Sequence, residues 1–296
     1  MAKLERSYVI DFAVSDFAAA CETFASIFDV DGVRMNPEKD SSGQLDGMHF
    51  PVGGVNAVGV MTARVAHRPD SDNHMARFLG SHGEGINILG HLVDDIDGYA
   101  AQLLERGVKL AYPTPVPYED GRLIISEAMH GVSFEFAQHH SDQVTNLWRH
   151  YYDENPQRRV RRALRVDVAV RDLDEAAKTF AIVLGLEPQE RTSFPANSRS
   201  VKGVDFAVGG LRALGLVALD GDARDPFAAA AADELDRRGD GGLLMSFEVD
   251  DLGKSVSELQ AKGVPFLFEA EPDGDTRCAL TAPLHGVRVQ LTEVAA

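Results

Sequence analysis

The chain has 296 residues, of which 44% are hydrophobic and 25% are charged, and its formal net charge is -17 at pH 7. This length is enough for two domains with full hydrophobic cores. The acidity argues against nucleic acids and anionic membrane surfaces as partners, because their phosphates would repel the chain. Neither a signal-peptide pattern nor a run of about 18 apolar residues occurs, so we expect a cytoplasmic protein without a membrane span.

One short pattern occurs four times along the chain: a strand that ends at an aspartate, followed by an amphipathic helix. The four copies occupy residues 9–16, 88–95, 165–172 and 244–251. After Asp16, Asp95 and Asp172, apolar residues recur at the spacing of one helix face. Each of these aspartates can accept hydrogen bonds from the first backbone N–H groups of its helix. Each copy therefore predicts a strand and a helix that packs on a sheet.

Further strands are predicted after each helix. In the first half they cover residues 47–52, 56–63, 121–127 and 132–136, and in the second half residues 203–208, 213–219, 276–281 and 287–292. Gly107 and Gly263 end the second and fourth helices, where a left-handed backbone is typical. The stretches 64–82 and 220–240 are expected to hold helical connections. Each module thus runs strand, helix and about three strands.

The two halves of the chain are related by a nearly constant offset. Asp11 and Asp167 are 156 residues apart, as are His49 and Asp205, and the offset becomes 155 near the end of each half. An almost gap-free offset over this length indicates internal duplication. We therefore predict an α+β fold with a first domain over residues 1–138, a linker over 139–162 and a second domain over 163–296. The linker is expected to hold a short helix.

The module order resembles that of the vicinal oxygen chelate superfamily, which includes glyoxalase I, methylmalonyl-CoA epimerase, bleomycin-resistance proteins and extradiol dioxygenases. Residues 77–108 and 130–136 are similar to segments of methylmalonyl-CoA epimerase-like members. The four-module length is instead that of the extradiol dioxygenases. The resemblance implies four βαβββ modules that pair into two half-open, cupped barrels, with a site on the concave face of a barrel.

The metal ligands that this resemblance implies are mostly missing. Relatives use a histidine on the first strand of each paired module and a glutamate on the last strand. The positions that match the histidines hold Val9, Ile88, Arg165 and Leu244. The glutamate position holds Glu135 in the first half and Gln290 in the second. No cofactor is therefore predicted with certainty, and Glu135 would bind a divalent metal only in a rearranged site.

Two carboxylates are the candidate catalytic residues. Strand alternation places Asp11 on the concave face of the first cup, two residues from the missing histidine position. A buried carboxylate needs a partner, or its pKa shifts. We predict that Asp11 and Glu135 point into this cup as an acid and base pair, or as part of a rearranged metal site. The alternative is a structural ion pair, which is favoured for Asp167 because Arg165 lies on the same strand face.

Four further residues are candidates for substrate binding: His49, Tyr118, Arg122 and His91. His49 lies on a predicted strand and faces either the cup or solvent. Tyr118 and Arg122 lie near a strand that borders the first cup, where an arginine could bind a carboxylate or phosphate, although a surface position is its default. Alternation turns His91 toward the helices, so it would reach the cup only through a β-bulge.

Three functions remain open at this point. The favoured one is a glyoxalase- or epimerase-like enzyme that performs non-oxidative proton transfer, or lyase or isomerase chemistry, on a small oxygenated molecule in the first-half cup. The second is an extradiol-type ring-cleavage dioxygenase. The third is a metal-free protein that binds a small molecule or confers resistance to it. A homodimer is an open alternative for the assembly. Fold alone does not choose among these functions.

Overall fold

The computed structural model of the protein describes residues 2–35, 44–112, 114–118, 121–141, 143–155, 158–273 and 276–294. The first half contains β1 (Leu4–Ala13), α1 (Phe17–Phe28), β2 (Val33–Arg34), β3 (Leu45–Pro51), β4 (Ala57–Ala63), α2 (His74–His82), β5 (Gly85–Val93), α3 (Ile96–Glu105), β6 (Val116–Tyr118), β7 (Gly121–Ile125) and β8 (Ser133–His139). Helix α4 (Gln143–Asp153) then leads to the second half.

The second half repeats this order of elements. It contains β9 (Val160–Ala169), α5 (Leu173–Leu184), β10 (Gln189–Glu190), the 3-10 helix η2 (Pro195–Asn197), β11 (Val201–Phe206), β12 (Ala213–Leu219), α6 (Pro226–Arg238), β13 (Gly241–Val249), α7 (Leu252–Ala261), β14 (Phe266–Asp273), β15 (Thr276–Thr281) and β16 (Arg288–Val294). The expected helical connections are present as α2 and α6. The outer strands β2, β6, β10 and β14 were not predicted.

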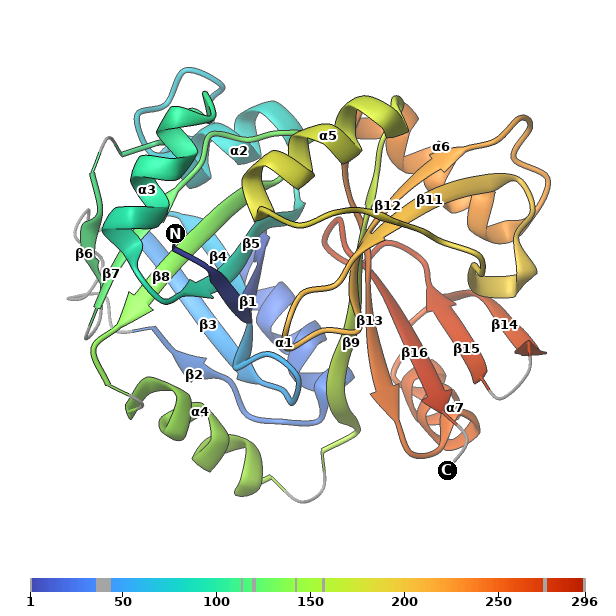
Figure 1. Cartoon of the computed structure of the whole chain (residues 1–296). Helices are drawn as coiled ribbons and strands as arrows, with labels where there is room; N and C mark the ends of the chain where they lie inside the picture. The colour runs from blue at the N-terminus through green and yellow to red at the C-terminus, as the bar shows by residue number, and fades with distance from the viewer. Residues whose placement is uncertain are drawn as a thin grey trace.

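Each half forms one eight-stranded mixed sheet, and the two sheets lie side by side in Figure 1. The strand order is β2-β3-β4-β1-β5-β8-β7-β6 in the first sheet and β10-β11-β12-β9-β13-β16-β15-β14 in the second. In both sheets the two modules meet where their first strands pair antiparallel. This is the predicted α+β fold of four modules paired into two sheets.

The strand registers confirm the duplication residue by residue. Asp11 lies opposite Gly59 and Ile88, and Asp167 lies opposite Gly215 and Leu244. Every one of these positions is shifted by the predicted offset of 156 residues. A side chain on Gly59 would overlap the Asp11 carboxylate, and one on Gly215 would overlap that of Asp167. The glycine thus makes room for the aspartate in each half.

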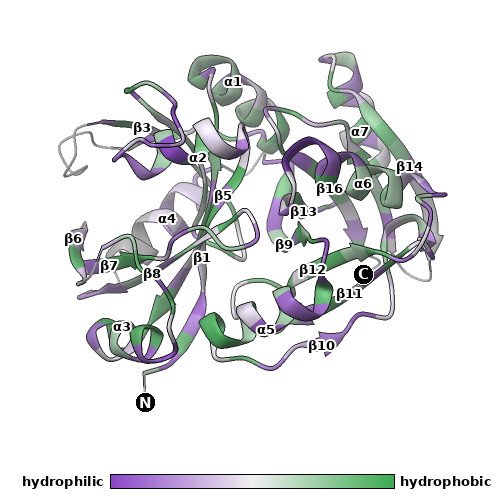
Figure 2. Cartoon of the chain, turned by 90° about the horizontal axis from the view of Figure 1, so that it is seen from above, coloured by the Kyte–Doolittle hydropathy of each residue, from purple (hydrophilic) through white to green (hydrophobic). Residues whose placement is uncertain are grey.

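One hydrophobic core joins the two halves. Its buried residues come from both sheets and from the inner faces of α1, α3, α5 and α7. The ring of Phe28 in α1 lies 5.1 Å from that of Phe247 in β13, and the ring of Phe134 in β8 lies 4.9 Å from that of Phe180 in α5. Figure 2 shows α1 and α5 near the boundary between the halves. The helix-bearing face of each sheet therefore packs toward the other half, which leaves the opposite face for a cup.

The segment between the halves differs from the prediction. Helix α4 confirms the expected helix, but β8 continues to His139 and β9 already begins at Val160. Both strands therefore extend into the predicted linker 139–162. The reason is that the ends of these strands still find hydrogen-bonding partners: His139 lies opposite Gly121, and Val160 lies opposite Val249. Among the residues described, no helix is long and apolar enough to cross a membrane.

The boundary between β5 and β13 offers a test of this packing. Gly242 occupies the repeat position of Ile86, and a side chain at Gly242 would overlap that of Ile86 across the boundary. We expect Gly242→Ala to lower the free energy of unfolding by about 1–3 kcal/mol through overpacking, as measured by urea denaturation. Gly253→Ala in α7 is the control, since its new methyl would lie 3.6 Å from the nearest atom. Equal stability of both variants would contradict the packing.

Candidate active site

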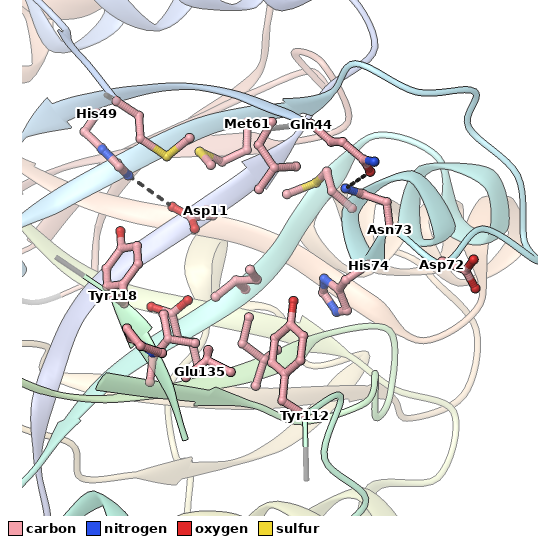
Figure 3. A pocket seen from close by; sticks show the side chains of 18 residues that line it. Asp11, Gln44, His49, Met61, Asp72, Asn73, His74, Tyr112, Tyr118 and Glu135 are labelled. Carbon is pink, nitrogen blue, oxygen red and sulfur yellow. Dashed lines mark hydrogen bonds and ion pairs between the residues drawn. The ribbon is translucent and has the colours of Figure 1, made fainter. Parts of the chain in front are cut away.

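A cavity of about 250 Å³ occupies the cup of the first half. Its walls include the acidic side chains Asp11, Asp72 and Glu135, the polar side chains His49, His74, Tyr112 and Tyr118, and apolar residues such as Met61, Ile88 and Leu123. Figure 3 shows these side chains around the cavity. No lysine or arginine lines it among the residues that the structure describes. The cavity is therefore partly apolar and carries negative charge.

Asp11 is a buried carboxyl group in this cavity. It lies on β1 with only 6% of its surface exposed, and none of the described residues donates a hydrogen bond to its Oδ1 atom. The nearest basic group is Nε2 of His49, 3.9 Å from Oδ1, which is beyond hydrogen-bonding distance. Burial, followed by the charge of Glu135, raises the pKa of Asp11 well above its ordinary value. Asp11 therefore holds its proton to a higher pH than a surface aspartate does.

Glu135 enters the same cavity from β8, and its Oε1 atom accepts a hydrogen bond from the hydroxyl of Tyr8. Burial and the charge of Glu135 raise the pKa of Tyr8 well above its ordinary value, so Tyr8 stays a donor. Tyr8 was missed by the sequence analysis, because strict alternation places it on the helix side. A register shift in β1 between Ser7 and Val9 turns Tyr8 to the cup.

His49 and Tyr118 are also brought to this cavity. Burial lowers the pKa of His49 to about 4, so its imidazole is neutral at neutral pH and does not balance the charge of Asp11. Its ring lies 5.4 Å from that of Trp148, in an edge-to-face arrangement. Helix α4 therefore supports this wall of the cup through Trp148. In Figure 3, Tyr118 lies beside Asp11 and Glu135.

A second polar group lies at the other end of the cavity. His74 begins α2, and its Nε2 atom lies 2.9 Å from the hydroxyl of Ser133. Burial, and then the charge of Arg77, lowers the pKa of His74 to about 4. Figure 3 shows Tyr112 next to it. The only sequence signal for His74 was Asn73, which caps α2 and so fixes where the helix begins.

His91 does not belong to the site. It lies on β5 with 1% of its surface exposed, and its ring packs between the sheet and the helices, 5.9 Å from the rings of Phe134 and Phe136. Its Nδ1 atom lies 3.0 Å from the Ser7 hydroxyl, and burial lowers its pKa to about 3. The predicted substrate-binding role of His91 therefore gains no support from its position. The register shift lies in β1 and turns Tyr8 into the cup, whereas His91 keeps the helix-facing direction that alternation gives it.

Arg122 was also predicted to bind substrate, and the structure places it elsewhere. Its guanidinium forms two hydrogen bonds with the carboxylate of Asp97 in α3, at 3.0 and 2.5 Å, on the exposed surface. It does not line the cavity, whereas its neighbour Leu123 does. Alternation along β7 explains the difference, since adjacent residues point to opposite faces of a sheet.

The second half shows what the same positions look like when the charges are balanced. Asp167, the copy of Asp11, is fully buried and lies 2.9 Å from Nη1 of Arg191 and 3.4 Å from Nη1 of Arg165. Arg165 also contacts Asp205, the copy of His49, at 2.5 Å. The predicted ion pair of Asp167 with Arg165 is present. The first half has Val9 and Met35 where the second has these two arginines.

The donors of the first cup do not fit a metal site of the kind that the resemblance implies. The two histidine positions hold Val9 and Ile88. Within the described part of the chain, no group of three or more histidine, cysteine, aspartate or glutamate side chains is placed to hold a metal ion. The proposed role of Glu135 as a metal ligand therefore gains no support from its neighbours, and its described contact is with Tyr8.

Comparison with known proteins gives a family-profile match within the second half and a similar fold for the whole chain. Residues 165–280 match the profile of the glyoxalase/bleomycin resistance protein/dioxygenase superfamily. A mutant 4-hydroxymandelate synthase from Streptomyces coelicolor is similar in structure, with a TM-score of 0.68 at 16% identity over 100% of this chain and 94% of that chain. The Mn(II)-bound glyoxalase from Novosphingobium aromaticivorans has a TM-score of 0.58 at 13% identity over 99% and 83%.

No curated protein sequence matches the chain. The profile match lies within the second half of the chain, and together with the duplicated module order of both sheets it supports a relationship to the glyoxalase/bleomycin resistance protein/dioxygenase superfamily, also called the vicinal oxygen chelate superfamily. At these identities the structural similarity shows the fold alone. The chemistry must be argued from the site.

The two equivalent aspartates give a paired test of their environments. We expect Asp167→Asn to lower the free energy of unfolding by about 3–5 kcal/mol, because two arginines lose their buried partner. Asp11→Asn should be at least as stable as the unmodified protein at neutral pH, because no described lysine or arginine pairs with Asp11. Urea denaturation of both variants measures this, and equal destabilisation by the two substitutions would contradict the assignment.

The pH dependence of Asp11→Asn follows from the raised pKa of Asp11. A carboxyl group whose pKa is raised by folding contributes stability below its ordinary pKa of 3.8, and this is lost as pH rises through the folded value. Asparagine does not titrate, so the variant should gain stability relative to the unmodified protein as pH rises above 3.8. The same denaturation series, repeated across pH, measures the difference.

Proposed function

We propose that the protein is an enzyme that moves a proton next to a carbonyl group of a small oxygenated substrate in the first-half cup, without oxidation. The single observation that supports this most is the buried Asp11, whose pKa is raised and which has no arginine beside it among the described residues, while its copy Asp167 has two. A carboxyl group that is neutral near pH 7 can donate a hydrogen bond or a proton to a carbonyl oxygen.

Glu135 is the complementary base in this proposal. Its carboxylate removes a proton from the carbon next to the carbonyl, and the electron pair of that C–H bond forms the carbon–carbon double bond of an enol. The carbonyl oxygen takes the proton of Asp11. The enol then returns its O–H proton to Asp11 as the carbonyl re-forms. If the carbon takes up a proton on the same face, the result is hydrogen exchange, and on the opposite face it is isomerisation. If instead a group on the next carbon leaves with its bonding electron pair, the result is an elimination. The hydrogen bond from Tyr8 holds Glu135 in position.

The remaining wall residues orient the substrate. Neutral His49 and Tyr118 provide hydrogen-bonding groups beside Asp11, and the apolar residues Ile88 and Leu123 line the cavity and exclude water from it. The ring-cleavage dioxygenase alternative requires a bound metal, for which the described donors do not fit. Oxygen uptake during turnover would favour that alternative over proton transfer.

Proton transfer can be measured before the natural substrate is known. We expect the protein in deuterated water to exchange the hydrogen next to the carbonyl in members of a panel of small ketones, aldehydes and hydroxyketones, as followed by NMR. Asp11→Asn and Glu135→Gln should each reduce this exchange by about 10²-fold or more. Their thermal unfolding temperatures should stay close to that of the unmodified protein.

Asp97→Asn is the control for this experiment, since Asp97 is an exposed carboxylate of the same half that pairs with Arg122 outside the cavity. It should exchange at the unmodified rate. A stable Asp11→Asn variant with full exchange activity would end the proposal. Activity that fell only in parallel with stability would assign Asp11 a structural role instead.

The second half suggests a variant that would place an arginine beside Asp11, as Arg191 lies beside Asp167. Met35 lines the first cavity and occupies the repeat position of Arg191, and the backbone N–H of each donates to the matching glycine, Gly47 or Gly203. An arginine introduced by Met35→Arg can therefore reach Asp11 as Arg191 reaches Asp167. It should lower the pKa of Asp11, because a nearby positive charge favours the carboxylate.

Exchange by the Met35→Arg variant should consequently be lost at a lower pH than in the unmodified protein, since the proposed role of Asp11 needs its proton. Met35→Leu is the matched control, because it keeps the apolar volume and adds no charge. The pH profile of deuterium exchange measures the shift. Identical profiles for both variants would show that the protonation of Asp11 does not govern the reaction.

A further inference from the structure

The cup of the second half contains its own cavity, also of about 250 Å³. Its polar wall includes Arg165, Arg191, Arg212, Ser246, Gln290 and Thr292. Three of the described lining residues are arginines, and none is an aspartate or glutamate. The charge of this wall is therefore opposite to that of the first cavity, which has carboxylates and no described cation.

The arginines of this wall differ in how they are held. Arg191 is fixed by Asp167, and its guanidinium lies over the ring of Phe194 at 4.6 Å. Arg165 is fixed by Asp205 but keeps 20% of its side chain exposed. Arg212 is exposed, and no described residue forms an ion pair or a side-chain hydrogen bond with its guanidinium. Among the described residues, three arginines of the wall face two aspartates, which leaves one positive charge without a carboxylate partner.

A buried amide lies on the same wall. Gln290 is 8% exposed, and its Nε2 atom lies 3.1 Å from the Thr292 hydroxyl and 3.4 Å from the Ser246 hydroxyl. Its Oε1 atom has no hydrogen-bond partner among the described residues. Exchanging the two ends of the amide would instead let the hydroxyls donate to the oxygen and leave the N–H groups unpaired. In either orientation one polar end of Gln290 lacks a partner, and a buried polar group of this kind requires one.

The comparison between the halves shows that these donors are specific to the second cup. In the first half the repeat positions of Arg165, Arg191, Arg212, Ser246, Gln290 and Thr292 hold Val9, Met35, Asn56, Gly90, Glu135 and Ala137. The strand register supports the match, since Gln290 lies opposite Ser246 and Glu135 lies opposite Gly90. At each position the second half has gained a hydrogen-bond donor, gained a positive charge or lost a negative one.

We propose that the second cup binds a small organic carboxylate. The guanidinium of Arg212 at the cavity, together with Arg165, attracts and pairs with the anion, and Gln290, Ser246 and Thr292 hydrogen-bond the ligand. Leu164, Phe194 and Cys278 provide apolar contacts for its carbon body. This site is separate from the first cavity and goes beyond the proton transfer proposed there.

Benzoate is a suitable probe, with benzamide as its uncharged counterpart and inorganic phosphate as a competing anion. Isothermal titration calorimetry at constant ionic strength should show saturable binding of benzoate to the full chain and no binding of benzamide. Arg212→Asn, which installs the first-half residue, should weaken benzoate at least about tenfold, because a hydrogen bond to a charged group is lost. Gln290→Glu, which also installs the first-half residue, should abolish binding by repulsion.

Arg224→Asn is the matched control, since Arg224 is an exposed arginine that pairs with Asp222 and does not line this cavity. It should bind benzoate as the unmodified protein does. The proposal is overturned if benzoate fails to bind, if benzamide binds equally well, or if Arg224→Asn weakens binding as much as Arg212→Asn. Tighter binding of phosphate than of benzoate would overturn the assignment to carboxylates.

Discussion

The packing of the helix-bearing faces of the two sheets into one core is the constraint on which the rest of the structure depends. Phenylalanines from both halves meet there, including Phe28 with Phe247 and Phe134 with Phe180. Burying each such side chain contributes roughly 1.5–3 kcal/mol, so the boundary is a major source of stability. Because this face of each sheet is occupied, each cup can form only on the opposite face. The two cavities can therefore change independently while the shared core stays the same.

The scaffold places one aspartate beside one glycine in each cup, and the surrounding residues decide what that aspartate does. In the second cup Arg165 and Arg191 balance the charge of Asp167, as expected for a structural ion pair. In the first cup Val9 and Met35 leave Asp11 among apolar groups, where burial and Glu135 raise its pKa. Equivalent backbone positions thus hold carboxyl groups in different electrostatic surroundings, one beside two arginines and the other beside a glutamate.

The sequence was sufficient for the fold because its signals are local and repeated. The four aspartate-capped helices and the offset of 156 residues predicted the module order and the match of Asp11 with Asp167. Strand alternation also predicted that Asp11 faces the cup and that His91 faces the helices, as the structure shows. Tyr8 could not be predicted, since a register shift reverses its direction. The position of His74 in the cavity depends on where α2 packs against the sheet, and the position of Arg122 depends on its contact with Asp97 in α3. Neither of these tertiary contacts can be read from the residues next to it in the sequence.

The contrast between the cups also bears on why Asp11 lacks a cation. An unbalanced buried carboxyl group costs stability as pH rises above its ordinary pKa. In the second half this cost is removed by Arg191, which lies 2.9 Å from Asp167. The equivalent position in the first half holds Met35. An arginine there would stabilise the fold but would hold Asp11 ionised and occupy part of the cavity. The fold therefore does not require Asp11 to lack a cation, whereas the proposed role of Asp11 as a proton donor does.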